Sequence, residues 1–374
     1  MAGSTGPDWG APGRVDEYYF ALVDPMTLAE VGRVEVEEGS SSLSWALDSD
    51  TILQGTLKLA DGDYRQQGYD RMVRVHHRVT VGGESVDHTM CTLFVSSVGT
   101  SSVFGRSSRS LSCYGPLWRY TQDVLARDFV RHAGDNVVDC IRDVVQYDGG
   151  VLTVGDGVDT SRVHSMDVFF PVGTNRAEVL RAYAGWIGCE IASGDDGSIV
   201  LRGYVSPQEK APVYTFEAGS RCVYESGIEW ETNRDEPINR VVAYFSRESK
   251  QDDDPLPLSD SVYVDVPDAS DFSFFRCGRR RTAVLKVSEP CTHEELTEQA
   301  QRYLDSSSAS LTYITVSHAG IPTLHVGDVV RYVNERDFER PVDVRCQIAQ
   351  MSVQALSPLC MTQSKLRLID AYQT

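Results

Sequence analysis

The last third of the chain constrains the fold most, because strand patterns there are interrupted by only one well-defined helix. A strand-like run, Asn239–Phe245, leads into a polar stretch and then into that helix. Thr292 with Glu295 three residues later forms a capping box, which marks where the helix begins. Two apolar runs, Thr312–Val316 and His325–Val333, then predict a strand pair, and two more strand-like runs close the chain. This order predicts an antiparallel β-barrel.

A second β-rich block lies near the N-terminus. Met72–Val81 is its longest run and ends at Gly82 and Gly83, a pair typical of a hairpin turn. Several strands at short spacing, with little helix between them, favour a barrel or sandwich. The other runs are Tyr18–Val23, Leu43–Leu47, Ile52–Leu59, Thr89–Val98 and Ser108–Tyr114.

Between the two blocks the pattern changes to mixed helix and strand. The stretch 117–147 reads mostly as helix, broken near Gly134, with Asp135 as the N-cap of its second part. Thr174 is expected to cap another helix, which Gly188 ends. The runs on either side of the turn 193–197 then predict a hairpin.

We therefore expect a mainly β protein with an α+β insertion: two antiparallel β-barrels that build a ring, and a small α+β domain. The strands predicted within 206–235 are expected to return to the first barrel. The predicted divisions are a loose arm at 1–15, a first barrel at 16–115 plus 206–235, an inserted domain at 116–205, and a second barrel at 236–374 with a polar excursion at 247–290 and a helix at 292–305.

Charge and composition exclude several classes of function. The formal net charge is −19, which argues against a general nucleic-acid-binding surface, because such surfaces depend on Lys and Arg. The acidity serves solubility or keeps the surface from sticking to nucleic acid. No run approaches the roughly 18 apolar residues of a membrane helix, and the N-terminus shows no signal-peptide core. We expect cytoplasmic synthesis and no stable membrane insertion.

Nine scattered cysteines and eight histidines offer no clear metal site. The cysteines lack a Cys-x-x-Cys spacing, so most are expected to be small buried hydrophobic residues. His76 and His77 are neighbours on a predicted strand and point to opposite faces, one buried and one exposed. His318 and His325 could approach each other across a hairpin, but no acidic third ligand is fixed by spacing.

The sequence also lacks the motifs of common catalytic and cofactor sites. It has no nucleophile elbow, no zinc-protease motif and no phosphate-binding glycine loop. The acidic turns at 154–158 and 195–197 do not continue as calcium loops. We therefore predict no catalytic residues, no cofactor and no metal.

One basic cluster stands out in this acidic chain. Arg279, Arg280 and Arg281 lie in a stretch that is either a solvated turn or a contact with an acidic surface of a neighbouring subunit. The acidic loop of Asp252, Asp253 and Asp254 is a candidate for that surface.

At this point the residues resemble a known family, the tail hub (baseplate hub) proteins of phages and prophages, related to the hub part of type VI secretion spikes. The resemblance covers nearly the whole chain past residue 15 and lies in the order of elements rather than in one invariant motif. It rests on the stretches 43–52, 70–75 and 91–95, on the helix and hairpin 174–204, and on the strand 239–242, the helix 292–304 and the run 321–330.

The resemblance implies a structural function in the virion. Each subunit would supply two similar barrels, and three subunits would form a homotrimer whose pseudo-sixfold face meets the hexameric tail tube or distal tail protein. A trimeric tip, spike or fibre protein would bind the other end. The tape-measure protein and then DNA would pass through the lumen, which an acidic lining would keep free of bound DNA. Trp45, Trp118, Trp186 and Trp230 would lie in subunit contacts or in the cores.

Two alternatives stay open from the sequence. The chain could be another tail-tip component, such as a distal tail or receptor-binding protein. It could instead be a hydrolase of cell walls or carbohydrates, although carboxylates are too common here to single out a catalytic pair.

Overall fold

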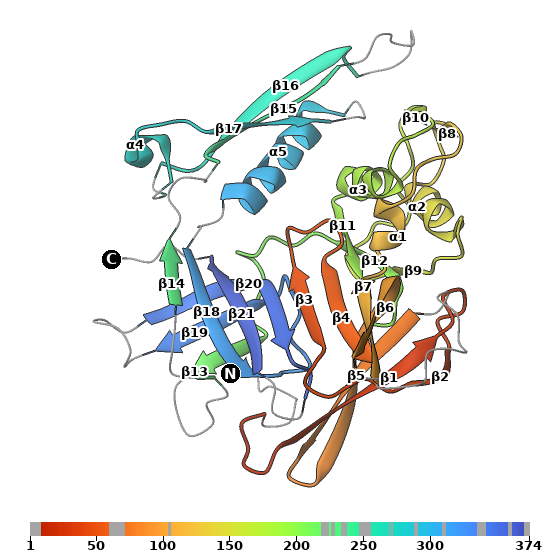
Figure 1. The fold of residues 1–374 in the computed structure, drawn as a ribbon. Coiled ribbons are helices and arrows are strands. Elements are labelled where there is room, and N and C mark those ends of the chain that lie inside the picture. Colours follow the sequence, from red (N-terminus) through yellow and green to blue (C-terminus); the bar gives the residue numbers. More distant parts are fainter. Residues whose placement is uncertain are drawn as a thin grey trace.

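The computed structural model describes residues 9–59, 72–103, 106–217, 224–225, 229–232, 238–246, 256–268, 270, 272–287, 291–308, 312–334, 342–357 and 361–369. The chain is mainly β, as predicted, with two β blocks, an inserted α+β unit and a small sheet covered by a helix (Figure 1). No helix in this part of the chain is long and apolar enough to cross a membrane.

Both β blocks belong to one 13-stranded sheet, ordered β14-β18-β21-β20-β3-β4-β7-β6-β5-β1-β2, with β19 beside β20 and β13 beside β19. The N-terminal block (β1–β7) and the C-terminal block (β13, β14 and β18–β21) meet where β3 pairs with β20. In chain order the strands are β1 Val15–Val23, β2 Glu30–Val34, β3 Ser42–Ala46, β4 Leu53–Leu59, β5 Met72–Val81, β6 Glu84–Val103, β7 Arg106–Tyr114, β13 Tyr214–Glu217, β14 Glu229–Thr232, β18 Thr312–Ala319, β19 Val329–Asn334, β20 Val342–Gln354 and β21 Met361–Leu368.

Each block has its own apolar core. Leu57, Val75 and Leu93 lie in the core of the N-terminal block, and Ile314, Tyr332 and Ile348 in that of the C-terminal block. The predicted hairpin between β5 and β6 is confirmed. Its turn residues Gly82 and Gly83 have φ angles of 60° and 88°, which favour glycine.

Two predicted strand pairings are wrong. β13 and β14 do not return to the N-terminal block, because they pair with β19 and β18 of the C-terminal block. The runs 312–316 and 325–333 do not form a strand pair either, since β18 lies between β14 and β21 while β19 lies between β13 and β20. His325 precedes β19 in a turn, so no hairpin brings it to His318.

The strand Asn239–Phe245 belongs to a separate layer rather than to the second barrel, which corrects that prediction. β15 (Arg240–Ser246) lies between β16 (Ser259–Asp265) and β17 (Thr282–Lys286) in a three-stranded sheet. Its alternate residues Val241, Ala243 and Phe245 are buried with Leu296, Ala300 and Leu304 of α5 (His293–Ser308). Alternation on the strand and helical spacing on α5 thus bury one face of each.

The capping box of α5 is confirmed by hydrogen bonds in both directions. The Thr292 hydroxyl accepts from the Glu295 backbone N–H at 3.2 Å, and the Glu295 carboxylate accepts from the Thr292 N–H at 2.9 Å. A four-residue helix, α4 (Phe274–Cys277), lies between β16 and β17.

The inserted unit has less helix than predicted. The residues 129–131, expected in a helix, form β8, because they pair with β10 far along the chain. Asn136 and Asn175 cap the two main helices in place of the predicted Asp135 and Thr174. The hairpin of β11 and β12 is confirmed. The elements are α1 Trp118–Thr121, β8 Phe129–Arg131, α2 Val137–Gln146, β9 Leu152–Val154, β10 Val168–Phe170, α3 Arg176–Trp186, β11 Cys189–Ser193 and β12 Ile199–Gly203.

This unit contains an internal duplication that the sequence analysis missed. Residues 123–149 and 162–188 each form a short strand, a glycine turn, an asparagine-capped helix and a closing glycine. The two copies keep one constant offset, and their contacts interchange under a twofold rotation between β8 and β10. The pair Phe129–Phe170 is equivalent to Val168–Arg131, and the bridge Val124–Asn175 is equivalent to Val163–Asn136. The side chain of Asp128 accepts from the Val172 backbone N–H, as Asp167 accepts from that of Ala133.

The described part of the N-terminal arm is anchored, which corrects the expectation of a loose segment. Trp9 is buried in the core of the C-terminal block, where its ring meets that of His88 edge-on. Arg14 pairs with Asp16 and donates to the carbonyl of Gly320. The arm therefore bridges the two blocks.

Candidate assembly surface

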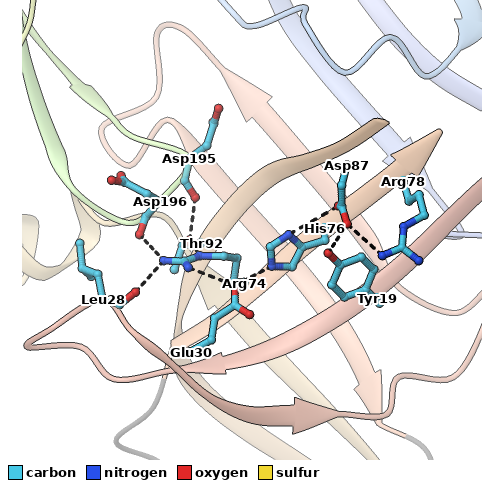
Figure 2. A network of polar contacts seen from close by, with 10 residues as sticks. All are labelled: Tyr19, Leu28, Glu30, Arg74, His76, Arg78, Asp87, Thr92, Asp195 and Asp196. Carbon is cyan, nitrogen blue, oxygen red and sulfur yellow. Dashed lines mark hydrogen bonds and ion pairs between the residues drawn. The ribbon is translucent and has the colours of Figure 1, made fainter. Parts of the chain in front are cut away.

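A network of polar contacts fixes the inserted unit against the N-terminal block (Figure 2). Arg74 of β5 lies at its centre. Its guanidinium group donates to the Thr92 hydroxyl at 3.1 Å and to the backbone carbonyls of Leu28 and Asp196 at 3.0 and 2.8 Å. Thr92 in turn donates to the carbonyl of Asp195 at 2.6 Å. The acidic turn between β11 and β12 thus presents one backbone carbonyl to Arg74 and the neighbouring one to Thr92.

The network continues along the outer face of β1, β5 and β6. Tyr19 donates to Asp87 at 2.6 Å, and Glu30 accepts from both Arg74 and His76, at 3.1 and 2.8 Å. Partial burial and the bond to Asp87 raise the pKa of Tyr19 to about 12. Burial would raise the pKa of Glu30, but the hydrogen bonds from His76 and Arg74 outweigh it and lower that pKa. Glu30 belongs to β2, a strand absent from the sequence prediction.

His76 and His77 point to opposite faces, as predicted, but both are buried, so the prediction of one exposed ring is wrong. Their exposed fractions are 8% and 2%. His76 stacks on Tyr19, and His77 stacks on Tyr18 and bonds Asp16 at 2.6 Å. Each ring is covered because β1 runs beside β5 and supplies a tyrosine on both faces.

A cavity of about 280 Å³ lies where the two blocks and the inserted unit meet. Trp45, His88, Ser193 and His325 are among its lining residues. His325 bonds Asp195 at 3.0 Å, and this bond raises the pKa of its ring. Ser193 Oγ is buried and makes no hydrogen bond to the described residues, so none of them is placed as a base to activate it. In the described residues no three His, Cys, Asp or Glu side chains are grouped to hold a metal ion.

His318 and Ser364 form a buried serine–histidine pair in the C-terminal block. The two side chains bond at 2.8 Å, and both residues have an exposed fraction of 0%. Burial lowers the pKa of His318 to about 4. A substrate cannot reach this pair, and a histidine held neutral among strands is a structural residue rather than a base in a cleft.

The predicted basic contact residues lie on an exposed turn between α4 and β17. Arg279, Arg280 and Arg281 are all exposed, and Arg280 lies over the ring of Phe274 at 4.5 Å. Phe274 and Phe275 have exposed fractions of 41% and 74%. The basic turn therefore borders an apolar surface. Asp252, Asp253 and Asp254 lie outside the described residues.

The small sheet next to this turn has one open face. Tyr263 and Val284 lie on either side of Val242 on the face opposite α5, with exposed fractions of 66% and 64%. Arg240 lies over the Tyr263 ring at 4.5 Å and pairs with Asp265. This face, α4 and the arginine turn together form an exposed apolar and basic surface, which is suited to contact with an acidic protein.

The cysteines in the described residues behave as packing residues, with one exception. Cys277 of α4 is exposed, whereas Cys91, Cys113, Cys140, Cys189, Cys291 and Cys346 are buried. Burial raises the pKa of Cys113 to about 12, which suppresses its reactive thiolate. Cys222 and Cys360 lie outside the described residues.

No protein-family model and no curated protein matches the sequence. Solved structures do match the fold. A tail protein from Neisseria meningitidis MC58 superposes with a TM-score of 0.62 and 15% identity, covering 94% of this chain and 96% of that one. The 43 kDa tail protein of prophage MuSo2 from Shewanella oneidensis gives 0.59 and 14%, covering 94% and 98%. A chain of the Francisella PdpA–VgrG complex gives 0.52 and 8%, covering 99% of this chain and 55% of that one.

The resemblance stated from the sequence is therefore confirmed at the level of fold. The match includes both blocks, the inserted unit and the small sheet, since it spans nearly all of the chain. This chain has the fold of these tail proteins, one of them from a prophage, and the chain of the PdpA–VgrG complex shares it at lower similarity.

Proposed function

We propose that this chain is a structural hub of a phage or prophage tail. The observation that carries the proposal is the fold match to two tail proteins, one of them from a prophage, over 94% of the chain. In the proposed assembly, three copies form a ring that joins the hexameric tail tube or distal tail protein to a threefold tip, spike or fibre. The tape-measure protein and DNA pass through the ring, and the site of action is the tail tip of the virion.

The two β blocks are the proposed ring-forming domains, and neighbouring copies complete the closure of their barrels. Edge strands of an open sheet expose backbone donors and acceptors, and β2 and β14 are the ends of the strand order here. We assign 16–115 to the first domain, 116–205 to the insertion, and 206–235 with 312–369 to the second domain. The small sheet and α5 form an appended unit.

The trimer is tested by native mass spectrometry of the purified chain and of tail tips. The expected result is a species three times the mass of the 41.4 kDa chain, found at the tube–tip junction. A chain that stays monomeric and never enters a tail would contradict the proposal. Location at the periphery of the tip, in contact with host glycans, would favour a receptor-binding component instead.

We further propose that the arginine turn contacts the acidic loop of a neighbouring copy. Changing Arg280 and Arg281 to Glu should lower the trimer fraction, and adding Asp252→Arg and Asp253→Arg should restore it. Arg142→Glu, an exposed change on α2, serves as the control and should leave the trimer intact. Failure of the paired reversal to rescue assembly would exclude this loop as the partner.

The role proposed here is non-enzymatic. The buried state of the His318–Ser364 pair supports it, and within the described residues no base is hydrogen-bonded to Ser193 Oγ. The chain should release no soluble fragments from purified cell wall, and release that one carboxylate change abolishes would refute this.

An acidic lumen is a further part of the proposal. A map of the assembled ring with a neutral or basic inner surface would reject it.

A further inference from the structure

The duplication in the inserted unit creates two equivalent grooves, one beside each main helix. Val124, Leu125, Ala126 and Tyr147 line the groove beside α2, together with Arg176 from the other copy. At the same offset, Val163, His164, Ser165 and Trp186 line the groove beside α3, together with Val137 from the other copy. These five lining positions correspond, so the occupant of one groove indicates what the shared wall of the other can hold.

The groove beside α3, here named the filled groove, already contains a helix of this chain. Cys291, Glu295 and Gln299, from the start of α5, form its outer wall and leave a space of about 40 Å³. Glu295 of the first helical turn pairs with Arg162 at 2.6 Å. The occupant is thus the first turns of an amphipathic helix, held by apolar contact and by one carboxylate.

The groove beside α2, here named the open groove, has no such cover. Its space is about 460 Å³, more than ten times that of the filled groove. Val124 is as exposed as its counterpart Val163, at 48%, but Tyr147 on the rim has an exposed fraction of 66%, whereas its counterpart Trp186 is half-buried. Figure 1 shows this side of the inserted unit turned away from α5. Exposed apolar residues around a concave surface are typical of a protein-binding site.

Asp123 stands at the position equivalent to Arg162, so the cations that match the carboxylate of such a helix lie elsewhere in the open groove. Arg131 and Arg127 line it. Arg131 pairs with Asp143 at 2.6 Å through Nη2, but its buried Nε makes no hydrogen bond within the described residues. Arg127 forms no ion pair in that part of the chain and is exposed. A buried donor without a partner is unfavourable, so an incoming acceptor would be favoured.

We propose that the open groove binds the first turns of an amphipathic helix from another protein, with a carboxylate directed at Arg127 and Arg131. A second copy of this chain has no helix to offer from its described residues. Its α5 is held by Leu296, Ala300 and Leu304 against the small sheet, and α2 and α3 are committed to the inserted unit. The partner is therefore a different chain, a conclusion independent of the proposed hub function.

The probe is a synthetic peptide with the sequence of residues 291–306, in which Cys291 is replaced by Ala and a fluorophore is attached at the C-terminus. Glu294 and Glu298, both exposed in α5, are joined by a staple, because a free helix of this length is marginal in water. Binding to the full chain is measured by fluorescence anisotropy. Glu295→Gln in the peptide should weaken binding about tenfold, since a charge-assisted bond is lost.

Matched protein variants locate the binding. Val124→Asp should abolish it, and Arg127→Gln with Arg131→Gln should weaken it about tenfold. Val213→Asp, at a position with a 57% exposed fraction outside the groove, should leave it unchanged. The double arginine variant keeps the test valid if Val124→Asp fails to fold. Binding that resists both groove variants would overturn the proposal, as would a concentration-dependent dimer that Val124→Asp abolishes.

Discussion

His318 makes the stability of the C-terminal block depend on pH, and His318→Gln should remove that dependence. In the folded chain burial lowers the pKa of His318 to about 4, from 6.5 in a model peptide. The unfolded chain therefore binds the proton first as the pH falls. The neutral ring is fully satisfied, because its Nδ1–H donates to the Ala319 carbonyl at 2.7 Å and its Nε2 accepts from Ser364 at 2.8 Å.

The size of the effect follows from the two pKa values. A difference of about 2.5 pH units corresponds to about 3 kcal/mol of unfolding free energy, lost as the pH falls from 6.5 to 4. His318→Gln should be less stable than the parent at pH 7, by about 1–3 kcal/mol, since a buried ring and its bonds are replaced. The parent protein should lose this stability advantage as the pH falls, and the unfolding free energies of the two proteins should cross or converge near pH 4.

Urea denaturation of both proteins at several pH values between 7 and 4 measures this difference directly. Other groups titrate in the same range, so the quantity of interest is the gap between the two curves rather than either curve alone. His132→Gln is the control, because the His132 side chain is 72% exposed and its removal should leave the curve shape unchanged. Parallel curves for the parent and His318→Gln would refute the reasoning.

Three further predictions concern the inserted unit and its junction. Gly134→Ala and Gly173→Ala, at equivalent turns with φ angles of 92° and 88°, should each lower the unfolding free energy by about 1 kcal/mol. Gly185→Ala inside α3 should raise it. Equal effects at all three sites in thermal melts would argue against a strained turn. Arg176→Met should lower the unfolding free energy by about 2 kcal/mol in denaturant melts, because Arg176 is buried and bridges Asp123, Asp148 and the Val144 carbonyl. Arg142→Met on the surface should leave the unfolding free energy almost unchanged. By NMR the His325 ring should titrate above pH 6.5, and its pKa should move back toward 6.5 in Asp195→Asn. The stability that the His325–Asp195 pair contributes is present below pH 6.5 and is lost as the pH rises through the raised pKa. An unchanged titration in Asp195→Asn would exclude the pair as the cause of the raised pKa.

Local signals predicted local structure well. The capping box of Thr292 and Glu295 and the hairpin at Gly82 and Gly83 appear as expected, because each depends on residues within a few positions. β5 matches the predicted run 72–81 from end to end. These elements are encoded by turn chemistry and periodicity that a single sequence displays.

Choices between distant partners could not be predicted in this way. The segment 129–131 has the apolar spacing of a helix, yet pairing with β10 makes it a strand. β13 and β14 are short, and nothing within them indicates whether β7 or β19 is the neighbour. Local preference is weak compared with the free energy gained by burial against a distant strand, so tertiary context decides.

Only part of the candidate site could be predicted from the sequence. The arginine turn was singled out and is exposed, but the network around Arg74 was missed because Glu30 lies on the unpredicted strand β2. The duplication left a readable trace, a glycine two residues before each capping asparagine, at Gly134 with Asn136 and at Gly173 with Asn175. Too few other positions agree for the repeat to be evident without the pairing of β8 and β10.

The junction of β3 and β20 has a mechanical consequence for the whole subunit. Five residue pairs, from Ser42 with Gln354 to Ala46 with Gln350, join the blocks through a continuous ladder of backbone bonds. Bending the molecule there would break those bonds together, so the two blocks must turn as one stiff body under load. Any change of shape is then confined to the inserted unit and to the small sheet with α5. The inserted unit is joined to the stiff body by chain connections and by side-chain contacts such as that of Arg74, and Arg162 joins it to α5.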